Sequence, residues 1–133
     1  MIFVSEEELK RLRELYPPML PVVLDAMNDS QAPPSGTKGL VQGVDDAGSI
    51  LVSWENGSRL SLLPNVDRFH VDETGVPLVV LRQVLHARQT GRTNMFDLAG
   101  VRAVAQEKGY RELTEYLKGT RDAYVRLILN GHA

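Results

Sequence analysis

The sequence predicts an α+β protein with an N-terminal helix, a small antiparallel β-barrel and a C-terminal unit of about three helices. A complete helix start stands near the N-terminus, strand candidates joined by tight turns occupy residues 36–64, and helical periodicity follows residue 76. So small a meander must curl into a barrel or lie against helices to bury its apolar face. We expect two domains, residues 1–72 with the first helix and the barrel, and residues 76–133 with the later helices.

The first helix is predicted from its capping residues. Ser5 fits the N-cap and Glu8 follows at the capping-box spacing, while Val4 and Leu9 stand at the positions of a hydrophobic staple. Acidic residues in the first turn suit the positive end of the helix dipole, and apolar residues at helical spacing give one stripe for docking. The pair Pro17-Pro18 ends this helix.

An apolar segment, residues 20–27, is the first strand candidate. Pro21 within it indicates an edge position or the start of a strand, because proline cannot donate to a β-ladder. The polar, proline-rich residues 28–36 follow, and we expect them to be a plain connector.

The central meander gives the strongest local signal. Lys38 to Val44 predicts one strand, Ser49 to Trp54 the next and Ser58 to Leu63 the third. Between the last two stands Asn56-Gly57, the pair typical of a tight hairpin turn because both residues tolerate positive φ. A short closing strand is expected at Arg68 to Val71.

The C-terminal half shows helical period together with helix start and stop signals. Gly119 in the middle of the last helix costs about 1 kcal/mol relative to alanine, which indicates a kink or close packing there. The expected helices are Pro77 to about Gln89, Leu98 to Lys108 with Asp97 as N-cap and Gly109 as stop, and Tyr110 or Arg111 to Asn130. The apolar stripe of the last helix comprises Leu113, Tyr116, Leu117, Thr120, Tyr124, Leu127 and Ile128.

Composition excludes several classes of protein. The 133 residues are 43% hydrophobic and 24% charged, which is ordinary for a globular domain, and no apolar run approaches the roughly 20 residues of a membrane span. The absence of cysteine excludes a disulfide framework, a thiolate nucleophile and a cysteine-based zinc site. We expect a cytoplasmic protein without a membrane partner.

The net charge of −2 conceals an asymmetry between the two halves. Residues 1–75 carry 6 Lys or Arg and 12 Asp or Glu, whereas residues 76–133 carry 9 and 5, so the halves sum to −6 and +4. A basic half indicates an anionic partner such as a nucleotide or nucleic acid. The alternative is that the basic half packs on the acidic half or only has solvated faces, and the sequence leaves both open.

No catalytic or metal signature is present. None of the three histidines has a second ligand at helical spacing, and the pair Asp45-Asp46 before Gly48 lacks the rest of a calcium loop. The stretch Gly36-Thr37-Lys38-Gly39 precedes a strand instead of a helix, so it has no helix N-terminus for a phosphate. We expect no enzyme activity, no cofactor and no metal.

Two binding surfaces are conceivable from the residues. The only tryptophan, Trp54, shares a strand face with Ile50 and Val52, which indicates a core position. The alternative places Trp54 with Arg59, Phe69 and Tyr16 on an aromatic and basic surface for a peptide or nucleic acid.

In the helical half, well-separated arginines are available for an anion, Arg88 and Arg92 among them. A helix-turn-helix is conceivable from Asp97 to Lys118, with Gly109 at the turn. Its second helix begins with Glu112 and Glu115, which would repel phosphate. The ligand-binding candidates are therefore Trp54, Arg59, Phe69, Arg88 and Arg92.

Two stretches resemble known but uncharacterised families. Residues 13–71 resemble a protein family whose members occur in phages, prophages and mobile elements and look like SH3-type β-barrels. The motifs that carry this resemblance are Gly36-Thr37-Lys38-Gly39 and Trp54-Glu55-Asn56-Gly57-Ser58. Residues 76–131, with Asn94-Met95-Phe96-Asp97 and Gly109-Tyr110, resemble a second phage-associated family that is small and helical. Neither family has an established activity or known site residues. Both resemblances imply that this protein comes from a virus or mobile element.

Three functions follow as expectations. The first is a non-enzymatic accessory protein in the host cytoplasm that counteracts host defence by sequestering a nucleotide-like anion or covering a host protein. The second is a module that binds DNA or RNA, and the third is a structural or adaptor protein. A homo-oligomer is compatible with each of them.

Overall fold

The computed structural model describes residues 4–119 and 121–133, and the chain divides into two units, Met1–Asp72 and Glu73–Ala133. Within the described residues the first unit holds four strands and one helix, and the second holds four helices. We call them the sheet unit and the helical unit and describe each by itself. The α+β class is the one that the sequence predicts.

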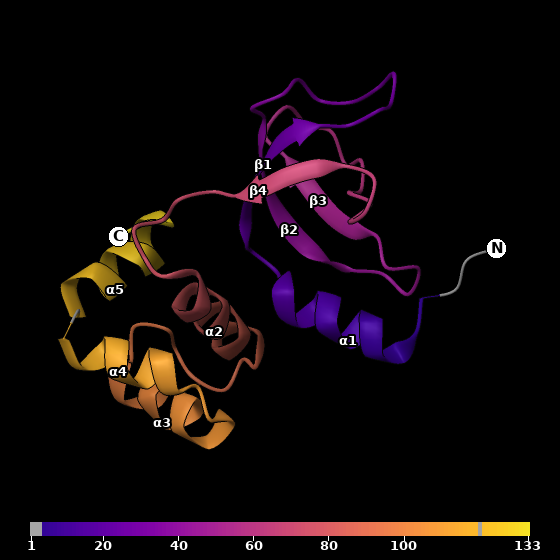
Figure 1. Cartoon of the computed structure of the whole chain (residues 1–133). Coiled ribbons are helices and arrows are strands. Elements are labelled where there is room, and N and C mark those ends of the chain that lie inside the picture. Colours follow the sequence, from indigo (N-terminus) through magenta and orange to yellow (C-terminus); the bar gives the residue numbers. More distant parts are fainter. Residues whose placement is uncertain (1–3, 120) are drawn as a thin grey trace. The chain divides into compact units, whose positions relative to one another are not determined.

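The sheet unit is built on one antiparallel sheet (Figure 1). Its strands are β1 (Pro21–Ala26), β2 (Lys38–Val44), β3 (Ile50–Trp54) and β4 (Arg68–Val71), in the spatial order β3-β2-β1-β4. Because β1 pairs with both β2 and β4, Pro21 stands at the start of a central strand and not on an edge. The β2 and β4 strands have the bounds that the sequence predicts.

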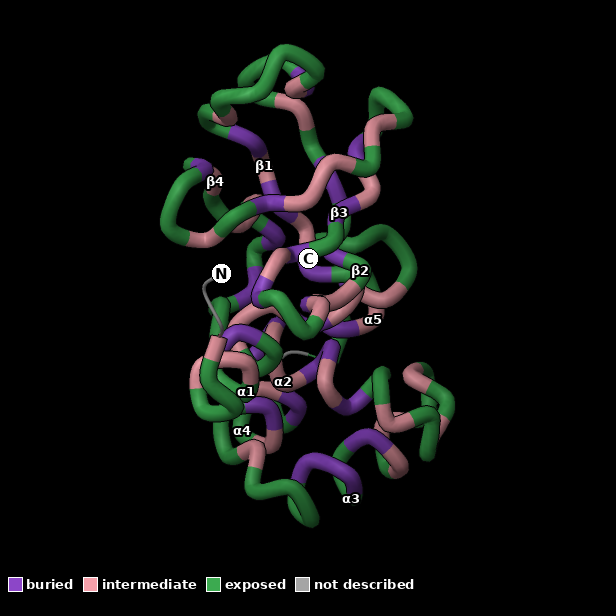
Figure 2. Tube along the Cα trace, turned by 90° about the vertical axis from the view of Figure 1, so that its right-hand side faces the viewer, coloured by how far each residue is buried: buried purple, intermediate pink, exposed green. Residues whose placement is uncertain are grey.

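One face of the sheet forms the core of this unit. Along β1, β2 and β3 buried residues alternate with exposed or half-buried ones, as the tube in Figure 2 shows. Such a period of two is the pattern of a sheet with one apolar face. The core side chains include Val22, Leu24, Val41, Val52 and Trp54.

The prediction of a third meander strand over Ser58–Leu63 is wrong. Leu62 forms an isolated bridge to β3 through two backbone hydrogen bonds of 2.8 Å to Ile50, and near the turn the carbonyl of Ser58 accepts from the N–H of Trp54 at 3.0 Å. The indole N–H of Trp54 donates to the carbonyl of Leu60 at 2.9 Å. That carbonyl therefore bonds to a side chain instead of a strand, and the segment runs beside β3 without a regular ladder.

The N-terminal helix α1 (Glu6–Leu15) begins as its caps predict, because the Ser5 hydroxyl accepts a hydrogen bond from the N–H of Glu8 at 3.1 Å. The Glu8 carboxylate accepts from the Arg11 guanidinium, and this hydrogen bond lowers the pKa of Glu8. Leu12 is buried, and Arg13 donates to the carbonyl of Val44 at the end of β2. These contacts fix α1 on the sheet unit.

The helical unit contains α2 (Leu78–Gln89), α3 (Leu98–Lys108), α4 (Arg111–Gly119) and α5 (Arg121–Asn130). Where the sequence predicts one last helix, the described residues form two, α4 ending at Gly119 and α5 beginning at Arg121. Thr120, a member of the predicted apolar stripe, lies outside the described residues. No helix in the described ranges is long and apolar enough to cross a membrane.

Tyr124 on α5 is completely buried in the helical unit. Its hydroxyl donates a hydrogen bond to the main-chain carbonyl of Met95 at 2.6 Å, which ties α5 to the loop between α2 and α3. Burial raises the pKa of the Tyr124 phenol well above its ordinary value, and the charge of Arg88 lowers it only in part. The remaining core residues of this unit are Val76, Val80, Leu81, Val84, Leu85, Ala87, Val101, Val104, Ala105, Leu113, Leu117 and Leu127.

Candidate nucleic-acid interface

Trp54 lies in the core and does not form a surface. Only 3% of the residue is exposed, and its indole N–H is bonded to Leu60. The aromatic binding surface that would include Trp54 is therefore wrong, and the alternative core position is the observed one. Gly39 lies opposite Trp54 in β2, where a Cβ would approach the indole ring to 2.7 Å.

The other two candidates of the sheet unit lie apart from this core position. Arg59 is exposed in the segment after β3. Phe69 on β4 is half-buried and packs against Tyr16, with ring centroids 5.6 Å apart and an interplanar angle of 58°. This tilted contact joins the end of α1 to β4, so Phe69 has a structural neighbour.

Arg88 and Arg92 stand at the C-terminal end of α2 and just after it, and both are exposed. Arg92 forms an ion pair with Glu107 on α3. Their hydrogen bond lowers the pKa of Glu107 and raises the pKa of Arg92. The five predicted site residues are thus divided between the two units, three in the sheet unit and two in the helical unit.

A tight turn at Gly109 ends α3 and connects it to α4. Gly109 adopts φ 73°, and its N–H bonds to the carbonyl of Gln106 at 3.3 Å. The N–H of Tyr110 bonds to the carbonyl of Ala105 at 2.8 Å. These two bonds make a Schellman motif, which ends a helix through a left-handed residue that glycine adopts without strain.

Gln83 on α2 holds the beginning of α4. Its side-chain carbonyl accepts a hydrogen bond from the N–H of Leu113 at 2.8 Å, and its amide donates to the Glu112 carboxylate at 2.7 Å. The bond from Gln83 lowers the pKa of Glu112. Since the first N–H groups of a helix lack partners within the helix, Gln83 supplies the cap that α4 does not carry itself.

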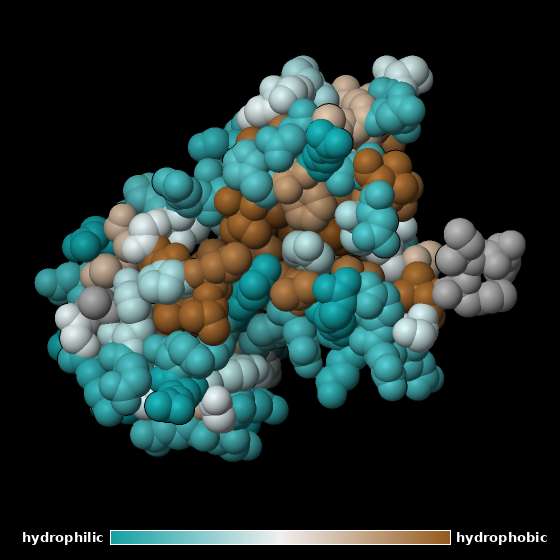
Figure 3. Space-filling view, in the orientation of Figure 1, coloured by the Kyte–Doolittle hydropathy of each residue, from teal (hydrophilic) through white to brown (hydrophobic). Residues whose placement is uncertain are grey.

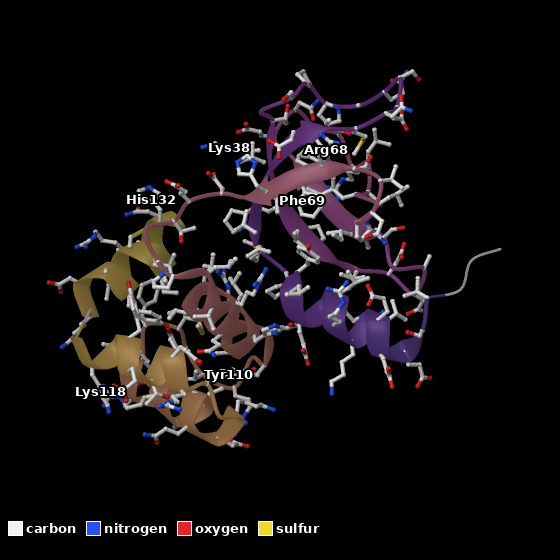
Figure 4. The ribbon with its side chains drawn as sticks, in the orientation of Figure 1. Lys38, Arg68, Phe69, Tyr110, Lys118 and His132 are labelled. Carbon is white, nitrogen blue, oxygen red and sulfur yellow. The ribbon has the colours of Figure 1, made fainter. Side chains whose placement is uncertain are left out.

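The outward face of α4 carries polar and charged side chains. Leu113 and Leu117 are buried, whereas Arg111, Glu115 and Lys118 are exposed at spacings of four and three and share one face. Glu115 pairs with Lys118 at 3.1 Å. Figure 4 shows Lys118 projecting away from the helical unit at the far end of α4 from Tyr110.

A shallow cavity of about 200 Å³ lies where α3 meets α4. It is smaller than the roughly 300–1,000 Å³ of sites that enclose a small ligand. We call this place, together with Lys118, the elbow surface. Its residues are Ala105, Gln106, Gly109, Tyr110, Arg111, Thr114, Glu115 and Lys118.

The two helices that form the elbow surface carry exposed basic side chains. Arg102 and Lys108 on α3 are exposed, in addition to Arg111 and Lys118. Residues 73–133 carry 9 Lys or Arg and 6 Asp or Glu, an excess of three positive charges. Within the described residues no group of three His, Cys, Asp or Glu could hold a metal ion.

Sequence reasoning did not identify Gln83 as a functional residue. It stands in a helix 30 residues before its main-chain partner, so no local pattern marks it. The turn residue Gly109 was identified from its position after a helical run.

Two family models match the chain, one for each unit. Residues 5–72 match a domain of unknown function, DUF4314, and residues 79–132 match a second domain of unknown function, DUF5049. No curated protein matches the chain. No solved structure matches it either.

Proposed function

The chain belongs to the DUF4314 family, and we propose that it is a non-enzymatic binding protein whose helical unit docks on double-stranded DNA through the elbow surface. The observation that carries this proposal is the arrangement of α3, the turn at Gly109 and α4, with the start of α4 fixed to α2 by Gln83. A helix held in this way presents its exposed residues as one rigid face.

The order of α3, a glycine turn and α4 is similar to that of a helix-turn-helix, which supports the proposal. In this motif a second helix enters the major groove with its N-terminal residues while the first crosses the backbone. Here α4 would be the groove helix and α3 the crossing helix. In this proposal Arg111 contacts a base edge or phosphate, together with Thr114, and both residues line the cavity. On α3, Arg102 and Lys108 are candidates for phosphate contacts, because cations of this kind supply most of the affinity.

The acidic residues at the start of α4 were the objection to this function. Glu112 turns to Gln83 of α2, and Glu115 pairs with Lys118. Both carboxylates therefore have cationic or amide partners in the free protein.

The experiment is a titration of fluorescently labelled duplexes of random sequence with the full chain, followed by anisotropy between about 50 and 200 mM salt. Affinity should fall steeply with salt, because each neutralised phosphate contributes about −0.9 to the slope of log K against log salt. Arg111→Ala should weaken binding about tenfold and lower the slope by about 1. Arg59→Ala, which removes an exposed arginine of the sheet unit, is the matched control and should leave binding unchanged.

Absence of binding at 50 mM salt would refute the proposal. Equal loss for Arg59→Ala and Arg111→Ala would show that only net charge matters. Binding restricted to single-stranded RNA would support the RNA alternative, because docking of a helix in a major groove requires a duplex.

A second candidate function is the counteraction of host defence, which follows from the phage or mobile-element origin that the resemblance implies. We propose that the sheet unit is a small SH3-like barrel, supported by its meander order and by the register shifts in β1 and β2 that curve the sheet. In a phage or mobile-element protein of the host cytoplasm, counteracting defence would mean covering a host protein or holding a nucleotide signal. Two exposed apolar side chains favour the covering of a host protein, since Phe96 is 52% exposed and Leu129 is 65% exposed.

Hydrophobic areas bordered by hydrophilic side chains are visible on the face that Figure 3 presents. Native mass spectrometry of the gently purified chain distinguishes these functions. A nucleotide-sized mass retained in stoichiometric amount would support sequestration, and a bare chain that binds DNA would contradict it.

A further inference from the structure

Two Asn-Gly pairs occur in the chain, Asn56-Gly57 in the turn after β3 and Asn130-Gly131 at the end of α5. An asparagine followed by glycine is a place where a chain can modify itself. The main-chain nitrogen of the glycine can attack the side-chain amide carbon, and glycine has no side chain that hinders this approach. The structure around each pair decides whether the two atoms can meet.

Asn56-Gly57 lies in a short loop closed by two main-chain hydrogen bonds. The N–H of Trp54 donates to the carbonyl of Ser58 at 3.0 Å, and the N–H of Gly57 donates to the carbonyl of Trp54 at 3.0 Å. Gly57 adopts φ 89°, whereas Asn56 does not have a positive φ. This corresponds to the three-residue hairpin loop that ends in a left-handed glycine. Both residues of the pair are exposed, so water reaches them.

The side chain of Asn56 is folded back along its own backbone. Its Oδ1 atom accepts a hydrogen bond from the N–H of Ser58 at 3.0 Å. This bond from two residues ahead is an Asx-turn, which holds the amide carbon beside the peptide group of Gly57. The same N–H stabilises the negative charge that Oδ1 gains when its carbon is attacked. The loop thus supplies both proximity and charge stabilisation.

One contact in the loop opposes the reaction. The attacking nitrogen of Gly57 has to release the carbonyl of Trp54 and lose its proton. This is one hydrogen bond at an exposed loop tip, and such a loop opens locally at a small cost compared with unfolding of the sheet. Apart from its chain neighbours, no atom of the described residues lies within 4 Å of a Cβ placed on Gly57, so the loop has room for a cyclic product.

The second pair is held in the opposite way. Asn130 is the last residue of α5, and the N–H of Gly131 continues the helical bonding to the carbonyl of Leu127 at 2.8 Å. In an α-helix each Cα–Cβ bond is inclined toward the N-terminus. The side chain of Asn130 therefore leaves the backbone on the side away from Gly131. Both residues are exposed, so exposure does not distinguish the two pairs.

We propose that Asn56 is a site of spontaneous self-modification, at which the folded chain loses ammonia and takes up water. The nitrogen of Gly57 forms a bond to the side-chain carbon of Asn56. The side-chain nitrogen leaves as ammonia and takes the proton that Gly57 gives up. Water then opens the cyclic imide at either carbonyl. One opening gives aspartate, and the other gives isoaspartate, in which the main chain runs through the former side chain.

The two products act differently on the sheet unit. Aspartate at position 56 keeps the acceptor for the N–H of Ser58 and adds one negative charge, so the loop persists. Isoaspartate inserts an extra main-chain carbon between Trp54 and Ser58, whose hydrogen bond closes the loop. The segment after the loop also provides the Leu60 carbonyl for the indole of Trp54. Isoaspartate therefore loosens the contacts of the buried Trp54, and aspartate does not.

The first test is incubation of the full chain at mildly alkaline pH, followed by trypsin digestion and mass spectrometry. Trypsin cleaves after Lys and Arg, so the two pairs fall in separate peptides, residues 39–59 and 127–133, each with one asparagine. In the folded chain we expect residues 39–59 to convert about tenfold faster or more, because one oxyanion donor alone contributes at least this much. In denaturing urea both pairs lose their surroundings, and the two rates should become similar.

The matched variant is Asn56→Gln, because a ring that is one atom larger closes far more slowly. Its residues 39–59 should stay unconverted, while conversion of residues 127–133 should not change. Asn56→Asp carries one product from the start, and its urea midpoint, followed by the fluorescence of Trp54, should stay close to that of the fresh chain. The isoaspartate form, isolated from the aged chain by ion exchange, should unfold at lower urea concentration.

Equal conversion of the two peptides in the folded chain, or conversion of residues 39–59 only in urea, would overturn the proposal. So would an equal mass gain in residues 39–59 of Asn56→Gln, because it would place the conversion at Gln42. An isoaspartate form as stable as Asn56→Asp would contradict the stated effect on Trp54. The reactivity of Asn56 does not depend on DNA binding, since every readout is taken without DNA.

Discussion

The side-chain carbonyl of Gln83 on α2 accepts the main-chain N–H of Leu113 on α4 at 2.8 Å. The same side chain donates to Glu112, so one residue satisfies the start of α4 and orients its first acidic side chain. The direction in which α4 presents Arg111 therefore depends on α2. Measurements of stability test the contacts within each unit, and an NMR titration tests the proposed DNA interface.

Gln83→Ala should destabilise the helical unit by about 1–2 kcal/mol, the typical cost of losing a helix cap and leaving an N–H without a partner. Hydrogen exchange should quicken most at the first amides of α4. Gln89→Ala, at the exposed end of α2, removes a glutamine that caps no helix and should change little. Unchanged exchange in α4 of the Gln83 variant would contradict the capping role.

Gly100→Ala and Gly119→Ala should act in opposite directions. At Gly100 a Cβ would clash with the Thr93 hydroxyl, so we expect a loss of about 1–3 kcal/mol. At Gly119 a Cβ meets nothing within 4 Å, so the better helix former should gain about 0.5–1 kcal/mol. Urea unfolding followed by circular dichroism measures both, and equal effects would be inconsistent with this packing.

The stability of the helical unit should decline at alkaline pH because of Tyr124. Burial raises the pKa of its phenol in the folded chain above the value near 10 of an exposed tyrosine. The stabilisation is therefore complete below about pH 10 and decreases as the pH rises from there toward the folded pKa.

Tyr124→Phe should cost about 1 kcal/mol at pH 7, because the carbonyl of Met95 loses its donor, and should flatten the alkaline decline. Urea unfolding at pH 7 and at about pH 10.5 measures this, with Tyr16→Phe in the sheet unit as the control. An alkaline decline that persists in the Tyr124 variant would exclude this phenol as its cause.

Gly39→Ala should destabilise the sheet unit by about 1–3 kcal/mol, since the added Cβ would lie 2.6 Å from the side chain of Val52 and 2.7 Å from the indole of Trp54. Trp54 is the only tryptophan, so its fluorescence reports this unit. Gln42→Ala on the exposed face of the same strand is the control. A Gly39 variant as stable as that control would contradict the close approach.

Local signals account for the part of the fold that could be predicted. The Ser5 cap, the strands Lys38–Val44 and Arg68–Val71, and the helix Leu98–Lys108 depend on neighbouring residues, and each was located from its own caps, turns or period. The Asp97 side chain caps the last of these at 3.1 Å.

Long-range contacts account for what could not be predicted. The loss of the strand at Ser58–Leu63 follows from the Trp54 indole taking the carbonyl of Leu60, and no pattern in that segment reveals this. The candidate site was predicted poorly for the same reason, because Gln83 contacts residues 29 and 30 positions away. The sequence predicts Arg88 and Arg92 as anion-binding residues, whereas Arg111 gains its place on the elbow surface from the packing of α4 against α3, which no local pattern shows.

The most direct test of the DNA interface is an NMR titration of the isotope-labelled full chain with a short duplex at low salt. The interface predicts that the largest amide shifts occur over residues 106–118, with smaller ones near Arg102 and none that saturate in β1–β3. Shifts concentrated in the sheet unit, or no shifts at stoichiometric duplex, would contradict docking through α3 and α4.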